Sequence, residues 1–209
     1  MIVRFSILFL SLLAFSCAEQ PVKTNKLLLP IIGEKKLAGV EGTDTIYHAI
    51  QPFSFINQFH DTVTEKVIEN KIYVADFFFA TCQSICPKMS SQLVHVQNAF
   101  KNDNDVLILS HTVNPLHDTV EVLNGYAQSY GAIKNKWHFL TGNKKAIYDL
   151  ARYSYLVNAL EEDGSAEGFL HSELFILVDV QKRIRGFYDG TDSVAVVKLI
   201  SDITLLKQE

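Results

Sequence analysis

Cysteine is scarce in this chain of 209 residues, which has only three, and this excludes a small scaffold held together by several disulfide bonds. A basic excess is also missing, since 19 lysine and arginine residues stand against 23 aspartate and glutamate residues, so nothing favours nucleic-acid binding. Hydrophobic residues make up 48% and charged residues 20%, which are ordinary values for a globular protein. The composition excludes a disordered chain, and the length favours one domain with an additional segment.

A long membrane-spanning run is absent too. The apolar stretch over residues 5–15 is too short to cross a bilayer as a helix, which needs about 20 residues. It follows Arg4 and precedes Ser16 and Cys17, an order typical of a secretory signal peptide. The alternative is a buried N-terminal helix or strand, but no amphipathic spacing is visible there.

Residues 13–17, Leu-Ala-Phe-Ser-Cys, resemble a bacterial lipobox, in which the cysteine becomes the first mature residue and carries lipid. We therefore predict a signal peptide over residues 1–16 and a lipid-anchored tether, with some extended structure, over residues 17–46. Cys17 is the predicted lipidation site. The protein is then exported and held at a membrane, facing the periplasm or cell envelope.

From about residue 47 onward, the spacing of apolar residues predicts strands that alternate with helices. The predicted strands cover residues 53–55, 71–79, 106–109, 137–140, 174–180 and 184–188. The predicted helices cover residues 87–100, 119–130, 144–153 and 193–207. This order predicts an α/β domain over residues 47–209, with a mixed sheet flanked by helices and a C-terminal β-hairpin and helix, as in thioredoxin-like domains.

Two cysteines remain for the predicted domain. Cys82 and Cys86 follow the predicted strand 71–79, at the sheet edge where open α/β folds bind ligands and where a helix N-terminus lowers a thiol pKa. Residues four apart share one helix face at about 6 Å, so both sulfurs can bind one metal ion or each other. Pro87 in place of histidine excludes a haem-attachment motif, and a zinc ribbon lacks its second cysteine pair. A structural disulfide and two inert core thiols remain alternatives.

A soft metal ion bound by two thiolates needs a further ligand, and the chain has seven histidines. His171 is the leading candidate, because the loop 161–168 before it returns beside the cysteine helix in a thioredoxin-like fold. His111, at the end of a predicted strand, is the second candidate. Two cysteines and one histidine suit Cu(I) and also Cu(II). Residues 169–175 lack the proline that thioredoxin-like oxidoreductases usually carry there, which disfavours general dithiol exchange.

Four segments, taken together and in this order, resemble the Sco/SenC family of copper-binding assembly factors for cytochrome c oxidase. They are 77–87 (strand and CxxxCP), 112–119 (DPxRDT), 137–142 (W-x-FLTG) and 171–190 (HS…LVD…YDG). The resemblance spans roughly residues 47–207. The chain departs from the family at Gln83 and Ser84, where Pro-Asp is frequent, and at Asn114 and His117, which replace the Asp and Arg of DPxRDT.

The resemblance implies a thioredoxin-like fold and copper, as Cu(I) or Cu(II), bound by Cys82, Cys86 and His171. It implies a metallochaperone whose partner is the copper A-bearing subunit of cytochrome c oxidase or another exported copper protein. A second family role is reduction of that centre's thiols, in which Cys82 and Cys86 would be the catalytic cysteines of a thiol–disulfide reductase. Enzyme activity is therefore left open, and a thiol peroxidase and a structural lipoprotein with an incidental disulfide remain as further alternatives.

Overall fold

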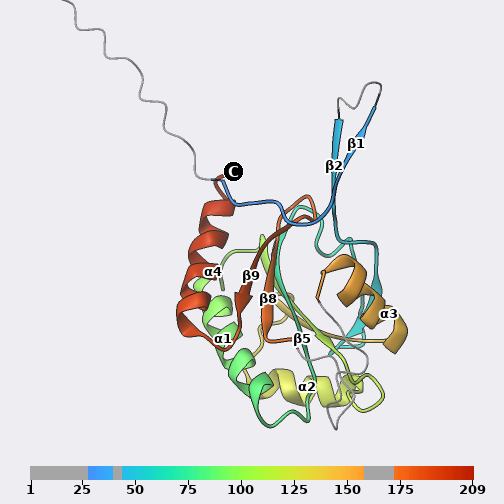
Figure 1. Ribbon diagram of the computed structural model, residues 1–209. Coiled ribbons are helices and arrows are strands. Elements are labelled where there is room, and N and C mark those ends of the chain that lie inside the picture. The colour runs from blue at the N-terminus through green and yellow to red at the C-terminus, as the bar shows by residue number, and fades with distance from the viewer. Residues whose placement is uncertain (1–27, 40–43, 158–171) are drawn as a thin grey trace, which may run out of the picture.

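The computed structural model describes residues 28–39, 44–157 and 172–209 (Figure 1). Its elements are, in chain order, β1 (Lys35–Ala38), β2 (Asp44–Tyr47), β3 (Ser54–Asn57), β4 (Thr62–Thr64), β5 (Ile72–Phe78), α1 (Ile85–Ala99), β6 (Val106–Thr112), α2 (Val120–Ser129), β7 (Trp137–Thr141), α3 (Lys144–Asp149), the π-helical turn η2 (Leu150–Ser154), β8 (Leu174–Val178), β9 (Ile184–Asp189) and α4 (Ser193–Leu206). In this part of the chain, none of the helices has the length and apolarity that a bilayer crossing requires.

Seven strands form one mixed sheet in the order β4-β3-β7-β6-β5-β8-β9. The central strands β5, β6 and β7 are parallel, whereas β8 and β9 continue the sheet in antiparallel pairing. Every residue of β5 and of β6 is buried, because helices cover both faces of the sheet. Helices α1 and α4 lie on one side of the sheet and α3 on the other (Figure 1). The predicted mixed sheet with its closing β-hairpin and helix is therefore confirmed.

The predicted elements differ from the structure in three places, and in one of them polar residues lie in the core. Strand β6 runs to Thr112, three residues beyond the predicted end, because the hydroxyl groups of Ser110 and Thr112 are buried while hydrogen-bonded to carboxylates. The predicted helix 144–153 is divided into α3 and η2. Strand β4, which was not predicted, pairs with β3 around a short turn.

Part of the segment predicted to be a tether contains regular structure. Strands β1 and β2 pair as an antiparallel hairpin that projects from the domain (Figure 1). The hairpin leaves Leu37 and Ile46 exposed, at 76% and 58% of their surface. Apolar residues on both faces of the hairpin meet solvent, so the hydrophobic pattern alone did not distinguish these strands from a tether.

The first described residues are fastened to the end of the chain by Arg185, whose side chain is 3% exposed. Its guanidinium donates to the main-chain oxygens of Leu29 (2.7 Å) and Pro30 (3.0 Å) and pairs with Asp179 (3.0 Å) and Glu209 (2.6 Å). Glu209 also accepts a hydrogen bond from the N–H of Leu29 (2.8 Å). We call these five residues the terminal clasp.

The terminal clasp lies at the end of the sheet that is opposite to Cys82. Strand β8 runs antiparallel to β5 and pairs Val178 with Tyr73, so Asp179 of the clasp follows directly beside the start of β5. Cys82 comes after the other end of β5. Figure 1 shows the C-terminus and the first described residues together beside the end of α4.

His111 on β6 is a core residue. It is fully buried, and both of its ring nitrogens lack a hydrogen-bond partner among the described residues. Four aromatic rings surround it, with centroids between 5.2 and 6.1 Å away: Phe53, Phe55, Phe77 and Tyr155. Burial lowers the pKa of His111 to about 3, so the imidazole is neutral at physiological pH.

We expect His111→Phe to raise the free energy of unfolding by about 1–2 kcal/mol at neutral pH, because a ring that needs no hydrogen bonds replaces an imidazole without partners. Between about pH 6.5 and pH 3, the unfolded chain binds a proton at His111 that the folded protein does not. This linkage makes stability fall as pH falls, by at most about 1.4 kcal/mol per pH unit. Urea unfolding at several pH values measures both effects.

His111→Phe should lose the contribution of His111 to the pH dependence of the free energy of unfolding. The matched control is His95→Gln on the exposed side of α1, which should change neither the stability nor the slope. An identical slope in His111→Phe and the unmodified chain would contradict the prediction.

Candidate metal centre

Cys82 and Cys86 lie together where the chain passes from β5 into α1. The Sγ of Cys82 accepts a hydrogen bond from the N–H of Cys86 (3.4 Å) and lies 3.7 Å from the Oγ of Ser84. Ser84 is the N-cap residue of α1, but its side chain does not cap the helix. The sulfur of Cys82 therefore satisfies a free N–H group at the helix N-terminus. Both cysteines are free thiols.

The two thiols differ in acidity. Partial burial of Cys82 opposes its ionisation, but hydrogen bonds with the backbone and side chains of Cys86 and Ser84 together outweigh it and hold the Cys82 pKa below the usual value. Cys86 is 3% exposed, and burial, together with the hydrogen bond to Cys82, raises its pKa well above the usual value. Cys82 is therefore the thiol that ionises first.

This difference predicts the order of alkylation. We expect iodoacetamide to modify Cys82 at least about tenfold faster than Cys86 at neutral pH, because the thiolate is the reactive form and Cys86 is shielded. Mass spectrometry of the modified peptides measures both rates. In the urea-unfolded chain the two rates should become similar, and equal rates in the folded protein would show that the helix N-terminus does not activate Cys82.

Two ionisable groups that affect or neighbour Cys86, the buried Asp76 and the partly buried Tyr126, were not identified from the sequence. Asp76 in β5 is 1% exposed and accepts a hydrogen bond from the hydroxyl of Ser110 (2.5 Å). Burial raises the pKa of Asp76 to about 7, and its charge acts to raise the pKa of Cys86. Burial likewise raises the pKa of Tyr126, whose hydroxyl contacts Ser90 (2.9 Å). The only signal for Asp76 was a single acid inside an otherwise apolar strand.

Asp76 gives a pH dependence of stability that is opposite to that of His111. Between about pH 4 and pH 7, folded Asp76 keeps a proton that the unfolded chain has released, so the free energy of unfolding falls as pH rises. The two windows overlap, so the two contributions partly cancel. Removing either group should expose the pH slope of the other.

The backbone ahead of Cys82 is held by Asp118, which is fully buried. One carboxylate oxygen accepts hydrogen bonds from the N–H of Ala80 (3.0 Å) and from the hydroxyl of Thr112. The other oxygen contacts Nδ1 of His117 (3.1 Å). The aspartate of the DPxRDT-like segment therefore fixes the loop that carries Cys82, a role that sequence spacing alone did not reveal.

Two predicted site residues, His171 and Cys17, lie outside the described residues, as does the loop 161–168. Within residues 28–39, 44–157 and 172–209, no group of three or more His, Cys, Asp or Glu side chains could hold a metal ion. The structure thus brings together the two cysteines, and the third ligand stays a prediction.

The fold and the cysteine pair define a thioredoxin-like domain with two thiols at a helix N-terminus. The SCO1/SenC family model matches residues 42–205. The chain therefore belongs to the SCO1/SenC family. A SCO1 protein homolog of Bacillus subtilis (strain 168) is 29% identical over 167 residues, which are 79% of this chain and 86% of the relative.

Solved structures of relatives share the fold. A SCO1/SenC family lipoprotein from Bacillus anthracis str. Ames has a TM-score of 0.69 at 25% identity, covering 77% of this chain and 95% of that one. BsSco, a member of the Sco family of cytochrome c oxidase assembly proteins with a disulfide switch, has a TM-score of 0.66 at 28% identity, covering 76% and 93%. Arabidopsis thaliana ScoI with copper bound has a TM-score of 0.61 at 29% identity, covering 77% and 100%.

Proposed function

We propose that this protein is a copper metallochaperone that binds Cu(I) or Cu(II) through Cys82, Cys86 and His171. The observation that carries the proposal is the pair of free thiols at the N-terminus of α1, with the Cys82 sulfur turned to the N–H of Cys86. Thiolates and imidazole are ligands that suit copper. The relative from Arabidopsis thaliana solved with copper bound supports this choice of metal.

Three protein ligands leave one side of the ion open, so a cysteine or histidine of a partner protein could take the copper by ligand exchange. The partner that we propose is the copper A-bearing subunit of cytochrome c oxidase or another exported copper protein. The role of BsSco among cytochrome c oxidase assembly proteins supports this partner. A lipid on Cys17 would hold the protein at the membrane, and the naming of the Bacillus anthracis relative as a lipoprotein supports that anchor.

Copper loading should depend on redox state and pH. A disulfide between Cys82 and Cys86 removes both thiolates, so the oxidised protein should not hold copper at this site. Protons compete for the cysteines and for His171, so affinity should fall as pH falls.

A thiol–disulfide reductase is the second candidate, favoured by the unequal acidity of the two thiols. The Cys82 thiolate would attack a partner disulfide and release one partner thiolate, which takes up a proton. The Cys86 thiol would then lose its proton and displace the second partner sulfur. Two electrons pass to the partner, which ends as a dithiol, and Cys82 and Cys86 end as a disulfide.

An anaerobic Cu(I) titration of the reduced chain against a competing chelator tests the proposal. We expect one copper ion per chain and a clear loss of affinity in His171→Ala, because one of three ligands is removed. His95→Ala on the exposed side of α1 is the matched control and should bind as the unmodified chain does.

Weak Cu(I) binding, or equal Cu(I) affinity of the unmodified chain and His171→Ala, would overturn the proposed copper site. The reductase would then be tested with a model disulfide, whose reduction requires both cysteines but not His171. Delivery is tested separately by mixing the loaded chain with an isolated copper A domain and measuring which protein holds the metal.

A further inference from the structure

A pocket lies away from the cysteines. It has a volume of about 490 Å³ and is bordered by β4, by the segment between β4 and β5, and by the first residues of β6 and β7. Strands β5, β6 and β7 are parallel, so their first residues lie at the opposite end of the sheet from Cys82. The volume is in the range of sites that bind small molecules. This pocket is therefore separate from the proposed copper site.

The amide of Asn57 has a fixed orientation beside this pocket. Its Oδ1 accepts hydrogen bonds from the backbone N–H groups of Phe59 (2.8 Å) and Asp61 (3.0 Å), so this atom must be the carbonyl oxygen. The Nδ2 group then faces Oδ2 of Asp61 and Nδ1 of His138, each at 3.4 Å. An amide nitrogen only donates, and therefore Nδ1 of His138 accepts.

This orientation determines the tautomer of His138. Since Nδ1 accepts, the ring proton of the neutral imidazole is on Nε2. Burial lowers the pKa of His138, whose exposed fraction is 5%, and this favours the neutral form. The Nε2 group has no hydrogen-bond partner among the described residues, and the ring lines the pocket. His138 thus offers one fixed, nearly buried N–H donor to a ligand.

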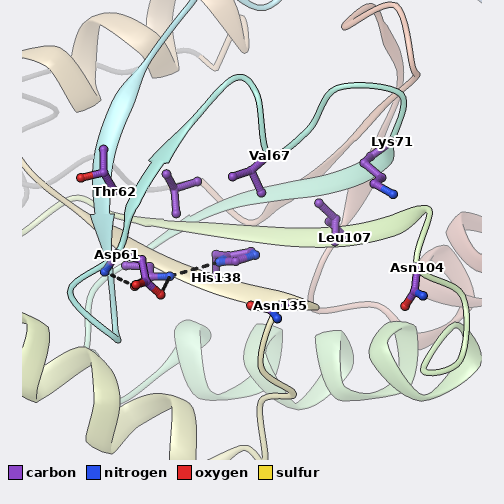
Figure 2. A pocket seen from close by; sticks show the side chains of 10 residues that line it. Asp61, Thr62, Val67, Lys71, Asn104, Leu107, Asn135 and His138 are labelled. Carbon is purple, nitrogen blue, oxygen red and sulfur yellow. Dashed lines mark hydrogen bonds between the residues drawn. The ribbon is translucent and has the colours of Figure 1, made fainter.

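Charged side chains lie on the two sides of His138, and the ammonium group of one of them, Lys71, is paired with Asp105 at 2.9 Å. Figure 2 shows Asp61 on one side and Lys71 on the other, with Val67 and Leu107 beside the space between them. Because Asp61 and His138 both contact Nδ2 of Asn57, the carboxylate and the imidazole are close neighbours. They can meet two groups carried by one carbon atom of a ligand.

We propose that this pocket binds a small zwitterion, namely a free α-amino acid with an aliphatic side chain. Its carboxylate accepts from Nε2–H of His138, at the end of the pocket where Lys71 is paired with Asp105. Its ammonium group pairs with Asp61. Its side chain packs against Val67 and Leu107. This site is independent of the proposed copper function.

Calorimetric titration of the full chain with L-leucine tests the proposal. We expect saturable binding of one leucine per chain. N-acetyl-L-leucine lacks the ammonium group and L-leucinamide lacks the carboxylate, so each should bind about tenfold to hundredfold more weakly. Absence of saturable leucine binding would overturn the proposal, and so would equal binding of the three compounds.

Variants assign the binding to this pocket. His138→Phe keeps a ring but removes the donor, and Asp61→Asn removes a charge at an exposed position; each should weaken leucine binding by about tenfold or more. Circular dichroism checks that His138→Phe folds, and Asp61→Asn serves as the test if it does not. His95→Gln is the control. Undiminished leucine binding by folded His138→Phe, or by Asp61→Asn, would overturn the proposal.

Discussion

Cys86→Ser is expected to lower the affinity of the reduced chain for Cu(I) by more than about a hundredfold. Replacing a residue that only supports a metal ligand already costs about 10–100-fold, and Cys86 is a proposed ligand itself. A serine hydroxyl is a harder donor than a thiolate and suits Cu(I) poorly. Competition with a chelator under anaerobic conditions measures the change.

Cys86 is 3% exposed, so the serine variant could also disturb the core. Cys82→Ser, at a less buried position, should cause a similar loss of affinity. Ser84→Ala is the matched control, because Ser84 neighbours the Cys82 sulfur without being a proposed ligand. Wild-type affinity in both cysteine variants would exclude the thiols as copper ligands.

Arg185→Ala is expected to lower the free energy of unfolding by about 3–5 kcal/mol. The substitution takes from Asp179, whose side chain is 3% exposed, the buried one of its two guanidinium partners and leaves only the more exposed Arg183. It also removes the donors to the main-chain oxygens of Leu29 and Pro30. Urea denaturation measures the loss.

The neighbouring Arg183 provides a comparison, since it pairs with the same carboxylate at 2.7 Å but is more exposed, at 22%. Arg183→Ala should therefore cost less than Arg185→Ala. Adding Asp179→Asn to Arg185→Ala should recover part of the loss, because the buried side chain that Arg185 helped to compensate is then neutral. Equal losses of the free energy of unfolding in the two arginine variants would contradict the prediction that the more buried ion pair contributes more to stability.

The central sheet could be predicted because its strands are apolar almost without interruption. Strand β5 follows the predicted range 71–79 closely, since burial on both faces leaves little room for polar residues. The end of β6 could not be predicted in the same way. Ser110 and Thr112 become compatible with the core only through the carboxylates of Asp76, on the neighbouring strand, and Asp118, in the loop after β6, and the strand pattern does not show these contacts.

The candidate site could be predicted only in part. Spacing and the preceding strand were sufficient to single out Cys82 and Cys86. Sequence spacing carries no information on which histidines are enclosed by other elements. His111 is surrounded by aromatic rings without a polar partner, whereas His138 is held by an asparagine beside a pocket, although both lie in buried strands.

The terminal clasp fixes the end of the sheet at which the N-terminal segment meets the domain. The chain joins the domain at one pole of the sheet, and the thiols lie at the other, separated by the seven residues of β5, about 23 Å. A protein held from its N-terminal side would therefore point its thiols away from the point of attachment. A partner would then reach the end of the sheet that carries the thiols without meeting the surface at which the chain enters the domain.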